Sequence, residues 1–223
     1  MAYRIKKVST PPRLNGDWNH PDWRTADVLD VKHFHADSSD HRPRTQIKAL
    51  YDNNGLSLFF RVDDRYVVSQ ATQHQESVCV DSCVEFFVEP KPTGNYVNFE
   101  FNCGGTMLVH YNVRRDEDGN EIHDRTLVDD AWLARIPIFH SMPNVVHPEI
   151  SEPVSWTLQY WVPFSLIAAY VGPLGTPSGQ TWHGNFYKCA DQCSHPHWAS
   201  WSPIGPVLSF HQTSSFALIH FEG

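Results

Sequence analysis

The sequence predicts an all-β protein: an antiparallel β-sandwich, of the jelly-roll or immunoglobulin-like kind, with at most one or two short helices. Roughly ten short runs alternate apolar and polar residues at a period of two, which is typical of strands. Turn-forming residues separate the runs, and only one segment has the character of a helix. We find no repeat or linker in the 223 residues, so we expect a single domain over residues 1–223.

In the first half of the chain, the strands are expected where alternation is clearest. Asp52-Asn53-Asn54-Gly55 separates two apolar runs and is typical of a hairpin turn. The polar or irregular segments 18–30, 33–44 and 66–80 are expected to be loops. The expected strands are residues 3–8, 45–51, 56–62, 81–89 and 96–102, followed by a third strand at 106–113 after the Gly104-Gly105 turn.

The second half continues the same pattern. The charged segment 114–130 is expected to be a loop with a turn at Asp118-Gly119-Asn120, and residues 140–152 and 191–206 are expected to be connections. Further strands are expected at residues 131–139, 155–162, 181–189 and 215–222. The one helix is expected over residues 163–170, because the first turn of a helix tolerates proline.

The hairpin of residues 81–89 and 96–102 provides the first functional clue. Val84, Phe86 and Val88 alternate with polar neighbours, and a turn centred on residues 90–95 places Glu85 opposite Glu100. Like charges directly opposite each other across a strand pair are destabilising. We therefore expect water, a cation or a ligand rich in hydroxyl groups to offset that cost.

The candidate ligand-binding residues surround these two acids. On the polar face, we expect Asn98 and Asn102 beside Glu100, Tyr111 from the third strand, and Lys188 as a counter-charge. Aromatic rings on loops offer sugars an apolar platform. The complete set of candidates is Glu85, Asn98, Glu100, Asn102, Tyr111, Tyr187, Lys188, Trp198, Trp201 and Phe210.

Other chemistries are weighed against this one. Two nearby carboxylates are what glycoside hydrolysis uses, so a hydrolase acting through Glu85 and Glu100 stays as an alternative, although the sequence shows no burial that would raise either pKa. Asp63, Asp64 and Asp81 could supply oxygen ligands to calcium. Cys189 and Cys193 lack a second cysteine pair, so free thiols are favoured over zinc there.

Composition excludes several classes of partner. The formal charge of −8 comes without a basic stripe, which argues against nucleic acid, and the absence of a long apolar run argues against a membrane span. The first residues lack the apolar core of a signal peptide, so the chain is expected to be cytoplasmic or exported by a signal outside it. Five scattered cysteines argue against a disulfide framework.

From about Leu14 onward, the order of motifs resembles carbohydrate-binding module family 9. Asp81-Ser82-Cys83-Val84-Glu85 is similar to the family's "D-S-V-E" hallmark. The other similar segments are residues 15–18 (Asn-Gly-Asp-Trp), 45–64, 96–104, 156–164, 184–186 (Gly-Asn-Phe), 201–203 (Trp-Ser-Pro) and 210–221.

This resemblance implies a non-catalytic β-sandwich that binds chain ends of plant polysaccharides such as xylan or cellulose, with structural calcium and association with glycoside hydrolases. Members hold the sugar between two tryptophans. Glu85 matches the acidic residue of the hallmark, and Phe210 falls near the second tryptophan. Glu100 stands where members carry arginine, and Val78 stands where they carry the first tryptophan. A domain whose sugar site has decayed is therefore a further alternative.

Overall fold

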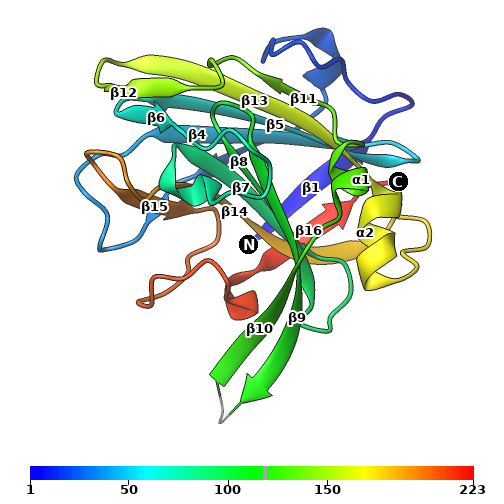
Figure 1. Cartoon of the computed structure of the whole chain (residues 1–223). Helices are drawn as coiled ribbons and strands as arrows, with labels where there is room; N and C mark the ends of the chain where they lie inside the picture. Colours follow the sequence, from blue (N-terminus) through cyan, green and yellow to red (C-terminus); the bar gives the residue numbers. More distant parts are fainter. Residues whose placement is uncertain (118–119) are drawn as a thin grey trace.

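The computed structural model describes residues 1–117 and 120–223, and it is a curled β-sandwich (Figure 1), which confirms the predicted fold class. Among these residues, no helix has the length and apolar character needed to cross a membrane. The strands are β1 Ala2–Lys7, β2 Val28–Val31, β3 His33–Phe34, β4 Arg44–Tyr51, β5 Gly55–Asp64, β6 Val67–Ser69, β7 Cys83–Glu89, β8 Tyr96–Asn102, β9 Met107–Glu117, β10 Asn120–Leu127, β11 Ile138–His140, β12 Val146–Ile150, β13 Val154–Pro163, β14 Thr181–Ala190, β15 His197–Ser200 and β16 Ala217–Phe221. The helices are α1 Asp130–Leu133 and α2 Phe164–Val171, with 3₁₀ turns at Pro21–Trp23, Val78–Val80 (η2) and Thr213–Ser215.

Two layers of strands face each other and share β1. One layer has the order β10-β9-β8-β7-β14-β16-β1, and the other has the order β1-β4-β5-β13-β11. Residues 2–5 of β1 pair in parallel with β16, and Lys6 and Lys7 pair in parallel with β4. Strand β15 extends the first layer beside β14, and β2 extends the second beside β4.

Aromatic rings fill the space between the layers. Phe86 of β7 stacks on Phe186 of β14 with ring centroids 4.6 Å apart, and Phe101 of β8 stacks on Tyr160 of β13 at 4.2 Å. These rings are essentially inaccessible to solvent. Burial of each such side chain contributes about 1.5–3 kcal/mol to folding, so the apolar halves of the alternating strands stabilise the sandwich.

Several element predictions need correction. The strand expected at residues 131–139 is wrong: helix α1 occupies its start and β11 begins only after Pro137, because proline interrupts an extended run. Segment 114–130, expected as a loop, is largely the β9–β10 hairpin; the turn predicted at Asp118-Gly119-Asn120 falls mostly outside the described residues. The loops expected at 18–30, 33–44, 66–80, 140–152 and 191–206 contain β2, β3, β6, β12 and β15.

Candidate functional site

Strands β7 and β8 pair in the register predicted from the sequence. Glu85 lies opposite Glu100, Phe87 opposite Asn98, and Cys83 opposite Asn102. Val84 and Phe86 point into the sandwich, so the two acids lie on the outer face of this layer. That face is not openly solvated, because Glu85 is only 2% exposed and Glu100 only 5%.

The sequence predicts Val109 beside Glu100 and Tyr111 beside Asn98 in the next strand, but the observed register differs by one residue. Asn102 pairs with Thr106 around the three-residue loop 103–105, in which Gly105 adopts a φ of +87°. Glu100 therefore pairs with Leu108. A shift of one residue exchanges the two faces of a strand. Tyr111, expected on the polar face, instead packs against the core and the ring of Tyr170.

A cleft of about 420 Å³ opens over the outer face of β7, β8 and β14. Strand β9 contributes Leu108 and His110 to it, and β10 contributes Arg125. The η2 turn and residues 208–211, which include the candidate Phe210, form part of its wall. The lining residues are Ser77, Cys79, Glu85, Glu100, Leu108, His110, Arg125, Cys189, Asp191, Trp198, Leu208, Ser209, Phe210 and His211.

The two acids at the base of the cleft have raised pKa values. Burial is the main cause for Glu85, and the negative charge of Glu100 adds to it. Burial raises the pKa of Glu100 to about 7, although Arg125 and a 2.7 Å hydrogen bond from Asn98 Nδ2 act in the opposite direction. Both carboxyls therefore take up protons more readily than solvated acids.

Polar partners hold the aromatic walls in place. Trp198 donates from Nε1 to Asp191 Oδ1 at 2.7 Å, and burial raises the pKa of Asp191. Phe210 stacks on Tyr187 with ring centroids 4.1 Å apart, and the Tyr187 hydroxyl donates to the Phe210 carbonyl. Tyr187 itself is buried beneath this stack and does not line the cleft.

Two histidines add neutral polar groups. Burial lowers the pKa of His211 to about 3, and burial likewise lowers the pKa of His110, with Arg125 adding to both effects. His211 Nδ1 lies 2.6 Å from the hydroxyl of Tyr96. Near pH 7, His211 therefore presents an uncharged imidazole to the cleft.

The two candidate asparagines form hydrogen bonds with neighbouring protein groups. Asn98 bridges Glu100 and Asn112, since its Oδ1 accepts from Asn112 Nδ2 at 2.6 Å. Asn102 donates to Asp81 and accepts from the Thr106 amide. Both are fully buried, and neither lines the cleft.

Lys188 and Trp201 lie away from the acids that they were expected to accompany. Lys188 faces the sandwich interior, where its Nζ lies 3.6 Å from Asp64 Oδ2 and 2.8 Å from His197 Nε2. It follows Tyr187 directly in an alternating strand, so it must point to the opposite face. Trp201 is 6% exposed and packs on Phe186 in the core.

The three aspartates proposed for calcium do not come together. Asp64 accepts hydrogen bonds from His41, Trp156 and the Arg65 amide and pairs with Lys188. Asp81 accepts from the amides of residues 70 and 71 and from Asn102, while Asp63 accepts from Arg61 and Ser155. Calcium prefers six to eight oxygen ligands. Nitrogen donors surround Asp64 instead, so these residues do not fit a calcium site.

Sequence reasoning missed the contributions of His110, Arg125, Asp191 and Cys79 to the cleft. The signal for His110 was present: Met107, Val109 and Tyr111 are the apolar alternates of their strand, which leaves position 110 on the polar side. Arg125 lies in a segment that the sequence predicts to be a loop and that does not alternate apolar and polar residues, so no sequence signal gives its face. Phe210, a candidate ligand-binding residue, lines the cleft together with residues 208, 209 and 211.

The polar, aromatic cleft on one face of a β-sandwich defines a class of ligand-binding domain. The chain matches carbohydrate-binding family 9 over residues 22–221 and belongs to that family. No curated protein matches it in sequence.

Solved structures extend the comparison. A candidate carbohydrate-binding protein from Bacteroides uniformis is similar to this chain with a TM-score of 0.87 and 27% identity, covering 99% of both chains. A family 9 carbohydrate-binding module from Caldicellulosiruptor kristjanssonii, solved with cellotriose, has a TM-score of 0.64 and 12% identity, over all of this chain and 94% of that one. The same organism's module with glucose has a TM-score of 0.61 and 12% identity, covering 99% of this chain and 96% of that one.

Proposed function

We propose that the chain binds carbohydrate without transforming it, in the cleft over β7, β8 and β14. The observation that carries this proposal is the combination of half-buried rings, Trp198 and Phe210, with the carboxyl groups of Glu85, Glu100 and Asp191 in one cleft. Sugars offer hydroxyl groups to polar partners and C–H faces to aromatic rings. The volume of about 420 Å³ is within the range of about 300–1,000 Å³ found for small-molecule sites.

The polar groups and the aromatic ring of the cleft make different contacts with a sugar in this proposal. The carboxyl oxygens accept hydrogen bonds from sugar hydroxyls, and Arg125 and His211, which line the same cleft, supply donors. The bond from Trp198 to Asp191 orients the indole, which lowers the entropy lost when a sugar ring packs on it.

The preferred sugars, we propose further, are xylan- or cellulose-type plant polysaccharides or their oligosaccharides, and association with glycoside hydrolases goes with them. Support comes from family membership and from the cellotriose and glucose in the two Caldicellulosiruptor structures. A panel of xylo-, cello-, manno- and chito-oligosaccharides tests the preference. Preferential binding of the last two would contradict it.

Isothermal titration with sugars selected from a glycan array tests the main proposal. Trp198→Ala should weaken binding at least about tenfold, as expected for an aromatic anchor. Trp132→Ala, a half-buried tryptophan of α1 outside the cleft, is the matched control and should leave affinity unchanged. Failure of the wild-type chain to bind any sugar would overturn the proposal and favour a domain whose site has decayed.

Glycan hydrolysis through Glu85 and Glu100 is the second candidate, and one observation favours it. The pKa of Glu100, raised to about 7, suits a general acid. Against it, Glu85 is 2% exposed and one of its carboxylate oxygens accepts hydrogen bonds from two thiols. Release of reducing sugar by the wild-type chain, abolished in Glu100→Gln, would favour hydrolysis over binding alone.

A further inference from the structure

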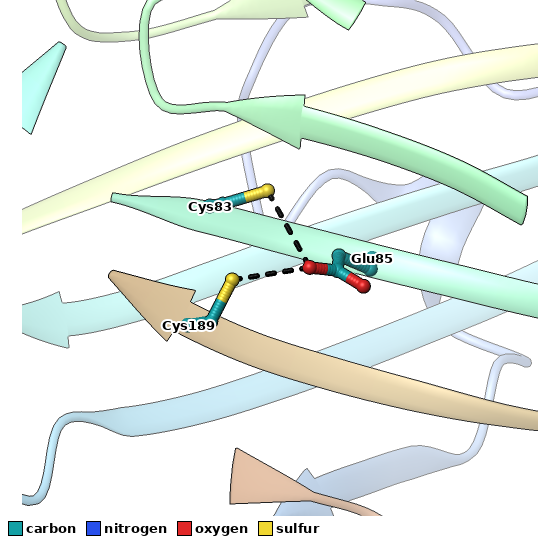
Figure 2. A group of neighbouring side chains, drawn as sticks. All are labelled: Cys83, Glu85 and Cys189. Atoms are coloured by element: carbon teal, nitrogen blue, oxygen red, sulfur yellow. Dashed lines mark hydrogen bonds between the residues drawn. The ribbon is translucent and has the colours of Figure 1, made fainter. Parts of the chain in front are cut away.

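Two cysteines and a glutamate meet at the base of the cleft. Cys83 of β7 and Cys189 of β14 are directly paired across the two strands, and Glu85 lies two residues after Cys83 on the same face. Both thiols point at one carboxylate oxygen: the Cys189 sulfur lies 3.0 Å from Glu85 Oε1, and the Cys83 sulfur lies 3.9 Å from it (Figure 2). These three atoms lie within 4.8 Å of one another.

We propose that Cys83, Cys189 and Glu85 form a zinc-binding site that opens into the cleft. Zinc takes thiolate ligands at about 2.3 Å and carboxylate oxygen at about 2.0–2.2 Å, which places ligand atoms on a shared ion roughly 3.5–3.8 Å apart. The observed separations reach that spacing with shifts of under about 1 Å. Two sulfur ligands select a soft ion such as zinc over calcium.

The charge distribution of the cleft favours a cation at this point. Glu85 and Glu100 lie opposite each other, and Asp191 lines the same cleft. A dication that replaces the two thiol protons, which pass to solvent, would relieve the repulsion among these groups.

The site also has the open position of a three-ligand zinc centre. Glu85 and Cys189 line the cleft, so the fourth ligand would come from that side. Cys79 of the η2 turn also lines the cleft, and its carbonyl oxygen lies 3.7 Å from the Cys189 sulfur. This proposal does not depend on carbohydrate binding.

Titration of the chelator-treated, reduced chain with zinc alone tests the site. We expect one zinc per chain, protection of two thiols from a thiol reagent, and a thiolate charge-transfer absorption when cobalt replaces zinc. Cys83→Ser with Cys189→Ser, and separately Glu85→Gln, should weaken zinc binding by more than about tenfold, since even partners of ligands contribute 10–100-fold. Cys103→Ala, which removes a buried thiol outside this group, should bind zinc like the wild type.

Three results would overturn the proposal. They are a wild-type chain that binds no stoichiometric zinc, a double serine variant that keeps wild-type zinc affinity, and a Cys83–Cys189 disulfide that dissolved oxygen forms as fast with zinc present as without it. If the double variant fails to fold, thiol protection in the wild-type chain decides the question. A parallel calcium titration should show no binding at this site.

Discussion

Lys188 and Cys189 are consecutive residues of β14, yet they belong to two polar clusters on opposite faces of the sheet. Lys188 lies between the layers with Asp64 and His197, where each oxygen of the Asp64 carboxylate meets nitrogen donors. Cys189 lies at the base of the cleft, where Glu85 and Glu100 meet thiols and an amide. The interior cluster pairs its charges, whereas the cleft cluster gathers acids.

Buried charged groups have two different roles in this protein. An internally paired cluster contributes to the fold and leaves nothing for a ligand. A cluster of acids beside an opening has unused bonding capacity, which a sugar or a metal ion can take up. Substitutions in the two clusters should therefore differ in kind: loss of stability in the interior, and loss of binding or gain of stability in the cleft.

The largest effect is expected from Lys188→Met. Removal of the ammonium leaves the fully buried Asp64 carboxylate without its cation, which should lower the free energy of unfolding by about 3–5 kcal/mol. Denaturant unfolding followed by tryptophan fluorescence measures this loss. Lys32→Met, at an exposed position, should change stability by less than about 0.5 kcal/mol, and an equal loss there would contradict the role given to Lys188.

A smaller, pH-dependent effect is expected from the interior cluster. Burial and the charge of Lys188 lower the pKa of His197 to about 3, so below its ordinary pKa of 6.5 the unfolded chain binds a proton that the folded chain does not. Stability should therefore fall as the pH drops from 6.5 towards 3, by about 2 kcal/mol at pH 5 from this residue alone. His197→Gln should reduce the difference between the free energies of unfolding at pH 7.5 and pH 5 by about 2 kcal/mol. An unchanged difference would contradict this role of His197.

The cleft cluster should respond to pH with the opposite sign. Because the folded pKa of Glu100 is raised to about 7, its contribution to stability is present below pH 4.5 and is lost as the pH rises through 7. Glu100→Gln should therefore stabilise the metal-free chain by about 1–2 kcal/mol at pH 8, with a smaller gain at pH 5. Thermal unfolding at the two pH values measures the difference, and destabilisation at pH 8 would show that Glu100 is paired like Asp64.

The smallest effect tests which side chains of β9 face the cleft. His110→Ala should weaken sugar binding, because His110 lines the cleft. Tyr111→Phe should leave sugar affinity unchanged and stability within about 0.5 kcal/mol, because its ring packs on the core side. Titration of both variants with one sugar compares them, and a loss of affinity confined to Tyr111→Phe would restore the register expected from the sequence.

The sequence predicted the fold class and the β7–β8 register because alternation and a turn-rich loop act locally there. It misplaced Tyr111 because the turn at Gly105 is one residue shorter than assumed. It misplaced Lys188 because both faces of β14 are buried, so a charged residue does not identify the solvent side. The meeting of Cys83 and Cys189 depends on pairing between strands about 100 residues apart, which no local pattern reports.

Strand β1 has a consequence for how the chain folds. Residues 2–5 pair with β16, and Lys6 and Lys7 pair with β4, so β1 joins the two layers only when residues 217–221 have arrived. Contacts between such distant segments require closure of a very long loop and slow folding. During synthesis, the sandwich would therefore stay open along this seam until its last strand emerges, with β1 and β14 exposing unpaired edges to other chains.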